Sequence, residues 1–242
     1  MKKIIGILIL LFVIVSCSQT EVSTEYRELS HQFDQFVIRD YHQTDGFIQL
    51  TNKLTTEYTP SSIRVSIRIL AANASVIEER VGSAFIIDSD ETHYYALTTS
   101  DHFFKEDAQL MIIGVYDYQG AYYPSRLKHI HEAGGLALLA FEKGPNTLVS
   151  ATLSQTVPFP KEPIFLMGNP FQTQNLILGG LYLGMVNHQG ETTIPSDHFG
   201  NGSALFNIEL HVIGIQVGLF DAKALFIPSS AILAWLETLD VR

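Results

Sequence analysis

Residues 81–88 read VGSAFIID, a short run of small and apolar residues that ends at an aspartate. Such a run is typical of a buried β-strand. Upstream, residues 63–69 alternate between aliphatic and polar side chains, which predicts a strand with one buried face. Further strand-like runs follow at residues 94–98, 110–116, 136–141, 163–167, 176–186, 204–206, 212–217 and 224–227. Many short strands separated by Gly, Pro, Asn and Asp predict an antiparallel barrel or sandwich rather than βαβ units.

The composition is that of a folded and acidic protein. Hydrophobic residues make up 46 % of the 242 residues, which excludes an intrinsically disordered chain. The 15 basic residues against 25 acidic ones give a formal net charge of −10 and argue against nucleic acid as a partner. The single cysteine excludes an intrachain disulfide and a Cys-rich zinc site. Burial of the core must therefore supply the stability.

The N-terminus carries the features of a secretory signal. Lys2 and Lys3 precede an apolar run over residues 4–15, which is shorter than the ~18 to 20 residues that span a bilayer. Residues 14–17 read IVSC and resemble the end of a bacterial lipoprotein signal. That resemblance implies cleavage before Cys17, a diacylglycerol on its thiol, and anchoring at the extracytoplasmic face of the cell membrane. The alternative is an ordinary signal peptide with an incidental cysteine.

Helical patterns flank the strands. Apolar residues recur at steps of three and four over residues 26–37 and, more weakly, over 47–54, which predicts amphipathic helices. A last helix is expected after Pro228, with Ile232, Leu233, Leu236 and Leu239 on one face. We therefore expect a lipoprotein signal at 1–16, a helical spacer at 17–59, and a β domain at 60–242 with halves near 60–150 and 151–242.

Several short sequence motifs of this domain, taken in chain order, resemble those of the trypsin-like serine peptidases, particularly the HtrA and glutamyl-endopeptidase types. Residues 81–88 resemble the G-S/T-G-F-I-I stretch before the catalytic histidine, and LTTSDHF at 97–103 resembles L-T-x-x-H-V. The remaining phrases are GGLALL at 134–139, MGNPF at 167–171, FGNGSALFN at 199–207 and VIGI at 212–215. The resemblance covers residues 60–238. It implies two six-stranded antiparallel β-barrels of the chymotrypsin type, with an active cleft between them.

The same resemblance assigns the catalytic positions. His102 stands at the position of the general base, Gly135 at that of the aspartate, and Gly202 at that of the nucleophile. Acyl transfer requires a hydroxyl nucleophile, an imidazole base and a carboxylate that orients the imidazole. Because glycine supplies neither a hydroxyl nor a carboxylate, we expect a catalytically inactive homologue that binds peptides or proteins at the cell envelope. The alternative is an active serine endopeptidase that uses the adjacent Ser203 with His102; a purely structural lipoprotein is a third possibility.

The sequence predicts no metal site and no cofactor. His129 and His131 are spaced to share one face of a strand, a pattern that can bind zinc. Their only candidate third ligands are Glu132 and the distant His198, so we interpret them as surface histidines. The expected partners are the membrane, through Cys17, and a peptide or protein in the cleft.

Overall fold

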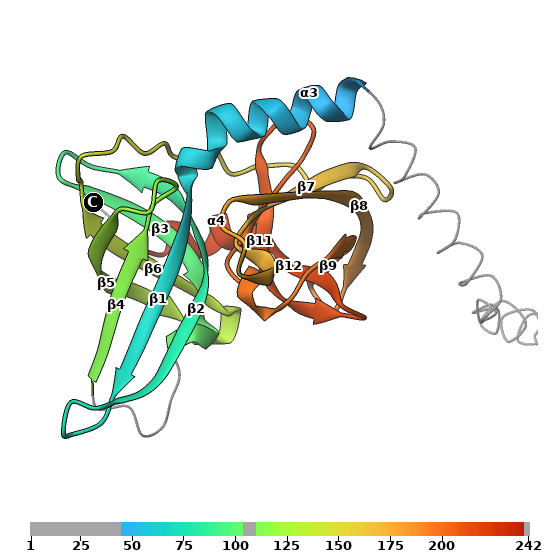
Figure 1. Ribbon diagram of the computed structural model, residues 1–242. Helices are drawn as coiled ribbons and strands as arrows, with labels where there is room; N and C mark the ends of the chain where they lie inside the picture. The colour runs from blue at the N-terminus through green and yellow to red at the C-terminus, as the bar shows by residue number, and fades with distance from the viewer. Residues whose placement is uncertain (1–44, 104–109, 240–242) are drawn as a thin grey trace, which may run out of the picture. The chain divides into compact units, whose positions relative to one another are not determined.

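The structure, a computed structural model, describes residues 45–103 and 110–239, and its strands form two closed barrels (Figure 1). The first barrel has the strand order β1-β2-β3-β6-β5-β4 and the second β10-β11-β12-β9-β8-β7. The strands of the first barrel are β1 (Ser62–Leu70), β2 (Val76–Ser89), β3 (His93–Thr99), β4 (Leu110–Tyr116), β5 (Tyr122–His131) and β6 (Leu136–Glu142). Those of the second are β7 (Pro163–Gly168), β8 (Leu176–Val186), β9 (Gln189–Pro195), β10 (Ala204–Phe206), β11 (Val212–Phe220) and β12 (Lys223–Pro228). All neighbouring strands pair antiparallel, which confirms the predicted double barrel.

Two strands were missing from the sequence prediction. β5 carries Pro124 and a register shift between Leu127 and His129, so its apolar residues do not keep a period of two. β9 buries Thr192 and Thr193, whose hydroxyls hydrogen-bond to backbone groups of neighbouring strands. Buried polar side chains whose hydroxyls are hydrogen-bonded interrupt the alternation of apolar and polar residues, so the sequence does not reveal the strand that carries them.

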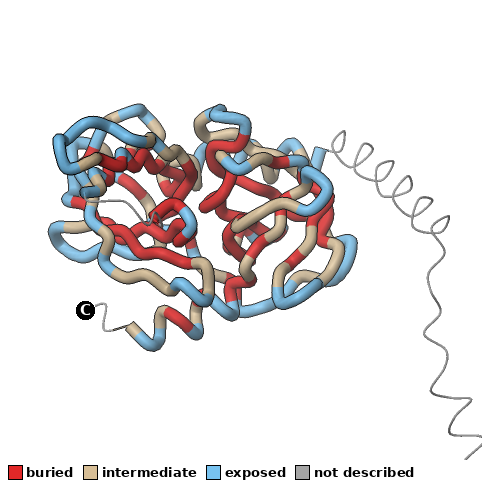
Figure 2. Tube along the Cα trace, turned by 90° about the horizontal axis from the view of Figure 1, so that it is seen from below, coloured by how far each residue is buried: buried red, intermediate tan, exposed pale blue. Residues whose placement is uncertain are grey.

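Apolar side chains form three cores, and Figure 2 shows buried residues gathered inside each barrel. One core fills the first barrel, with Ile67 and Leu139 among its members, and another fills the second, around Ile194 and Phe226. The third lies between the barrels and joins residues of both, such as Phe85 and Phe206. This shared core fixes the two barrels against each other and so positions any site at their junction.

Helices cover the ends of the chain that the structure describes. α3 (Asp45–Lys53) lies across the second barrel, where the rings of Phe47 and Phe165 have centroids 5.3 Å apart (Figure 1). α4 (Ser229–Glu237) follows β12, and its Trp235 stacks on His131 of the first barrel at 5.7 Å. Neither helix, nor any other in the described residues, is long and apolar enough to cross a membrane. Cys17 and the predicted helix at 26–37 lie outside the described residues.

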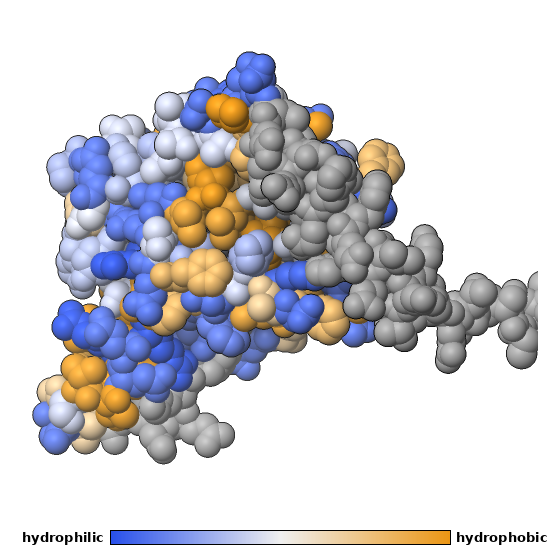
Figure 3. All heavy atoms as spheres, turned by 45° about the vertical axis from the view of Figure 1, so that its right-hand side comes forward, coloured by the Kyte–Doolittle hydropathy of each residue, from blue (hydrophilic) through white to orange (hydrophobic). Residues whose placement is uncertain are grey.

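Exposed apolar side chains gather at one end of the first barrel, around the β1–β2 hairpin and the start of β4 (Figure 3). Val76 is 54 % exposed and Leu110 is 56 % exposed, and both pair with Leu70 of β1. Ile77 and Ile112 extend the patch along β2 and β4. We call these four exposed residues (76, 77, 110 and 112) the apolar tip of the first barrel.

A buried carboxylate ties the first barrel to the rest of the molecule. Asp117 is fully buried and accepts four hydrogen bonds; the donors are the backbone N–H groups of Gln119 and Ala121, the Tyr123 hydroxyl and the Asn146 side chain. Its backbone carbonyl accepts a 2.6 Å bond from Gln174 of the second barrel. Burial by itself would raise the pKa of Asp117, but the hydrogen bonds outweigh it and hold this pKa below its ordinary value. Burial and the Asp117 carboxylate in turn raise the pKa of Tyr123 to about 12.

Replacing this carboxylate by an amide is expected to destabilise the fold. In Asp117→Asn an amide NH₂ faces donors that need an acceptor, so we expect a loss of about 1–3 kcal/mol in the free energy of unfolding at pH 7. The native pKa is depressed, so the carboxylate's contribution is complete above its unfolded pKa of about 4 and disappears as the pH falls through the native value. Urea unfolding at pH 7 and pH 3 measures both effects.

The expected signature is a difference between wild type and Asp117→Asn that is large at pH 7 and shrinks at pH 3. Glu91→Gln, an exposed carboxylate in the β2–β3 turn, serves as the control and should leave the unfolding midpoint unchanged. Equal stability of Asp117→Asn and wild type at pH 7 would show that the buried network has no net effect.

Candidate functional site

His102 lies at the junction of the barrels, just after β3, in the short 3-10 helix Ser100–Phe103. Its side chain is only 7 % exposed. The Arg80 guanidinium of β2 holds this helix, because its Nη1 donates to the carbonyls of Asp101 at 3.1 Å and of His102 at 3.2 Å. Arg80 Nε also donates to the carboxylate of Glu78 at 2.6 Å. The position of the imidazole is therefore fixed by both the strand and the arginine.

The imidazole faces a backbone carbonyl. Nε2 of His102 lies 3.3 Å from the carbonyl oxygen of Asn201, and the ring packs against Gly82, where a Cβ atom would collide with it. Burial lowers the pKa of His102 more than the Asp101 carboxylate and the Asn201 carbonyl raise it, and Arg80 lowers it further. The neutral imidazole is thus the favoured form at neutral pH.

The turn that would hold a nucleophile has no free backbone N–H group. The 3-10 helix His198–Gly200 leads into Asn201, Gly202 and Ser203. The N–H groups of residues 200–203 all donate within the protein; their acceptors are the carbonyls of Asp197, His198, Gln216 and Gly200 in that order. The carbonyl of Asn201 accepts from the Ser83 N–H at 2.9 Å as well as facing His102. The polar backbone group that this turn directs at the imidazole is therefore an acceptor.

Gly202 and Ser203 lie in the interface between the barrels. Gly202 has a φ of +92°, and a Cβ there would collide with the carbonyl of Ser83. Ser203 is fully buried, and its Oγ donates to the Ser83 Oγ at 3.0 Å. Among the described residues no hydrogen bond joins Ser203 to His102. The structure places Gly202 and Ser203 against Ser83, and the polar group that faces Nε2 of His102 is the carbonyl of Asn201.

Gly135 occupies a left-handed turn at the start of β6. It ends the 3-10 helix Glu132–Gly134 with a φ of +69°, and its carbonyl accepts from the Ser100 N–H at 3.0 Å. In the described part of the chain, no carboxylate hydrogen-bonds to the His102 ring. Asp101, its neighbour in sequence, instead accepts from the side chain of Asn201 at 3.0 Å.

The side chain of Gln216 in β11 stabilises this turn through hydrogen bonds. The sequence alone did not identify Gln216 as part of the site. Its side chain is fully buried and accepts from the Ser196 hydroxyl at 2.8 Å. It also donates to the carbonyl of Asp197 at 2.9 Å and to the side-chain oxygen of Asn201 at 3.4 Å. The only signal in the sequence was a polar residue inside the aliphatic run VIGIQVG at residues 212–218.

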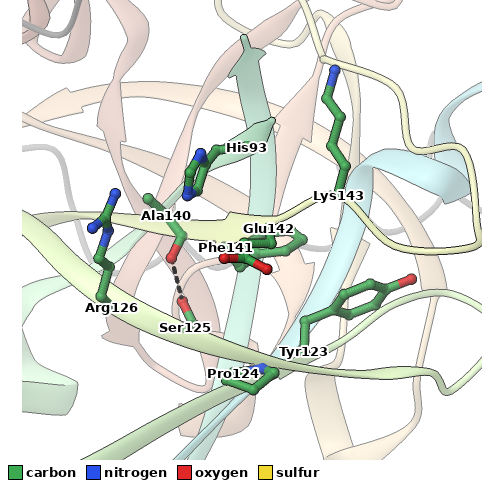
Figure 4. Close-up of a pocket in the computed structure, with 9 residues that line it drawn as sticks. All are labelled: His93, Tyr123, Pro124, Ser125, Arg126, Ala140, Phe141, Glu142 and Lys143. Atoms are coloured by element: carbon green, nitrogen blue, oxygen red, sulfur yellow. Dashed lines mark hydrogen bonds between the residues drawn. The ribbon is translucent and has the colours of Figure 1, made fainter. Parts of the chain in front are cut away.

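A cavity of about 480 Å³ opens beside His102. Its lining consists of Glu78, Glu79, Arg80, Val81, Asp101, His102, His198, Phe199 and Asn201. A second pocket of about 490 Å³ lies on the outer face of the first barrel, where Arg126, Lys143 and His93 surround Phe141 and Glu142 (Figure 4). That second pocket contains none of the residues that the sequence nominated.

The predicted surface histidines have different surroundings. His131 packs its ring on Trp235, and His129 lies one residue past the register shift of β5. Within residues 45–103 and 110–239, no three His, Cys, Asp or Glu side chains are placed to hold a metal ion.

Two closed six-stranded antiparallel barrels with a histidine buried at their junction define a protein of the chymotrypsin-like fold. The family model of the trypsin-like peptidase domain matches residues 82–215, a range that includes His102, Gly135, Gly202 and Ser203. The chain belongs to this family of trypsin-like peptidase domains. No curated protein matches the sequence significantly.

The two glycines at the site give a matched pair of substitutions. Gly202→Ala forces a Cβ into the Ser83 carbonyl in a left-handed backbone, so we expect a loss of more than about 2 kcal/mol in unfolding free energy. Gly135→Ala has the same backbone strain, but its nearest neighbour would be Ile227 Cδ1 at 3.4 Å, so the expected loss is about 1–2 kcal/mol. Denaturant unfolding of the two variants checks the order; a smaller loss for Gly202→Ala would contradict the packing described for the turn.

Proposed function

We propose that this protein is a catalytically inactive member of the family that binds extended peptides in the cleft between its barrels. It performs this role as a lipoprotein on the extracytoplasmic face of the cell membrane. The observation that carries the proposal is the carbonyl of Asn201, which lies 3.3 Å from Nε2 of His102.

Acyl transfer needs a hydroxyl beside the imidazole and N–H groups directed at the developing oxyanion. Here a carbonyl oxygen lies beside the imidazole, and the N–H groups of residues 200–203 already have acceptors. Removing one oxyanion donor typically costs about 10²–10³ in turnover, and loss of a triad about 10⁶. In addition, the position that the resemblance assigns to the orienting carboxylate is occupied by Gly135, which has no carboxylate. Together these features support binding without catalysis.

The alternative, an active endopeptidase using Ser203 and His102, requires a different turn. Ser203 would have to give up its hydrogen bond to Ser83 and leave a fully buried position. The Asn201 peptide would have to rotate and lose its bond from the Ser83 N–H. These costs favour the inactive protein.

Peptide binding is supported by an open strand edge beside the site. β11 pairs with β10 only over residues 212–215, whereas its pairing with β12 continues to Phe220. Among the described residues, no strand therefore pairs with one edge of residues 217–220. Such an edge binds an extended peptide through main-chain hydrogen bonds, which is how β-strand addition gains affinity. Gln216, at the start of this edge, connects it directly to the turn beside His102.

A side chain on Gly218 tests this edge. A Cβ at Gly218 meets no atom within 4 Å, so we expect Gly218→Leu to place its side chain beside the strand and to keep the fold. We expect it to weaken binding to an immobilised array of unstructured peptides at least about tenfold, because the peptide main chain can no longer approach. Gly46→Leu on α3 also enters open space and is the matched control. Equal binding by both variants and wild type would place the peptide elsewhere, and no binding by wild type would refute the proposed function.

The membrane anchor rests on the sequence IVSC at residues 14–17. A diacylglycerol on Cys17 contributes roughly 0.8 kcal/mol per buried methylene, enough with two acyl chains for stable anchoring. Cys17→Ser expressed in a bacterial host is expected to move the protein from the membrane fraction to the soluble extracytoplasmic fraction. Retention of the serine variant in the membrane fraction would refute lipid anchoring at this residue.

A further inference from the structure

We infer that the apolar tip of the first barrel inserts into the interface of the lipid bilayer to which Cys17 anchors the protein. This inference rests on the lipid anchor of the proposed function and adds a second membrane contact to it. The four residues of the tip are between 38 % and 56 % exposed, and they come from the β1–β2 hairpin and the start of β4. Exposed aliphatic side chains that gather on one surface mark a place where a protein meets another apolar surface.

The strands and the turn that form the tip carry no charged residue. Residues 69–77 read ILAANASVI, and residues 110–116 read LMIIGVY. The nearest charged residues of β1 and β2 comprise two of each sign and are Arg68, Glu78, Glu79 and Arg80. Residues 104–109, which precede β4, lie outside the described residues and are not counted in this surface. An uncharged end that is followed by balanced charges is suited to a bilayer, which is apolar inside and polar at its boundary.

The turn at the end of the hairpin bonds its own polar groups. The N–H of Ala71 donates to the carbonyl of Ser75 at 2.9 Å, and the N–H of Ala74 donates to the carbonyl of Ala71 at 2.9 Å. The side-chain oxygen of Asn73 accepts from the N–H of Ser75 at 3.1 Å and from its hydroxyl at 2.7 Å. Backbone groups that are already bonded lose little when lipid displaces water, whereas unbonded ones are strongly disfavoured there. This turn can therefore lie against lipid.

The proposed anchor can bring the tip to the same membrane. The described chain begins at α3, and β1 runs from the α3 side of the molecule to the tip (Figure 1). A strand of the length of β1 extends for about 30 Å. Residues 18–44, which connect Cys17 to α3, span at most about 90 Å when fully extended. Because a tethered membrane is present at high effective concentration, a weak contact by four side chains is sufficient for insertion.

The size of the tip favours lipid over a protein partner. Its four partly exposed side chains fall short of the roughly 800 Å² that each partner buries in a standard protein interface. Binding to lipid instead increases gradually with the apolar area that is covered. A bilayer is therefore the expected occupant, and a second copy of the chain or another protein is an outcome that the test must recognise.

The test places a fluorescent probe on the tip of the lipidated, full-length protein. Ile77→Cys is labelled with an NBD dye and reconstituted into phosphatidylcholine vesicles, with or without a spin label on the acyl chains. We expect the spin-labelled lipid to quench the emission from residue 77 at least about twofold, because the dye lies at the bilayer interface. Phe159, which is 81 % exposed in a loop outside the tip, gives the matched control. A dye on Phe159→Cys should be quenched by iodide in the buffer and not by the lipid.

Wild type separates a failure of the anchor from a failure of the tip, because Cys17 is its only cysteine. A lipidated thiol does not react with the dye, so labelling of wild type would count against the anchor and against the inference that rests on it. If wild type takes up no dye and the lipid leaves the emission from residue 77 unquenched, the inference about the tip is overturned while the anchor stands.

A charge on the tip tests the same contact. Leu110→Asp, combined with the dye at residue 77, adds a carboxylate at a position that is 56 % exposed. We expect it to reduce the quenching by lipid at least about twofold, because charged groups are disfavoured in the bilayer. Phe159→Asp should leave the quenching unchanged, and equal quenching in the two variants would overturn the inference. A blue-shifted emission from residue 77 that the lipid does not quench would show that protein covers the tip, which also overturns it.

Discussion

The contact between the Ser83 N–H and the Asn201 carbonyl determines the geometry at the junction of the barrels. Ser83 belongs to β2 of the first barrel, and its side-chain oxygen also bonds to Asn169, Ser203 and Phe199, all of the second barrel. One serine thus joins three segments of the second barrel to a strand of the first. Since this contact fixes the direction of the Asn201 peptide, it also decides which backbone group faces His102.

The direction of the Asn201 peptide distinguishes this site from the arrangement that acyl transfer requires in this fold. The barrels and the buried imidazole are present, and among the described residues one edge of β11 beyond residue 216 has no partner strand. The turn, however, directs a carbonyl where acyl transfer would need donors, and rotating that peptide would break the bond to Ser83. A hydrogen bond from the Gln216 side chain to the side-chain oxygen of Asn201 stabilises the same arrangement. We therefore propose that the cleft acts as a binding surface, since a fold by itself does not specify an activity.

Much of this architecture could be predicted from the sequence, because most strands carry continuous or alternating apolar residues. β5 and β9 could not, since a register shift at Leu127 and buried threonines interrupt the pattern. At the site, the resemblance nominated His102, Gly135, Gly202 and Ser203 by their order in the chain. It could not predict that Asn201 faces the imidazole, because the direction of a peptide group depends on hydrogen bonds with residues more than a hundred positions away, such as Ser83.

The measurement that tests this account most directly is the reaction of the full-length protein with a fluorophosphonate, followed by intact-mass spectrometry. Such a reagent phosphonylates a serine only where an imidazole and oxyanion donors activate its hydroxyl. The account predicts that the mass of the protein stays unchanged after prolonged incubation, in wild type and in Ser203→Ala alike. A stoichiometric adduct that maps to Ser203 and disappears in Ser203→Ala would contradict it.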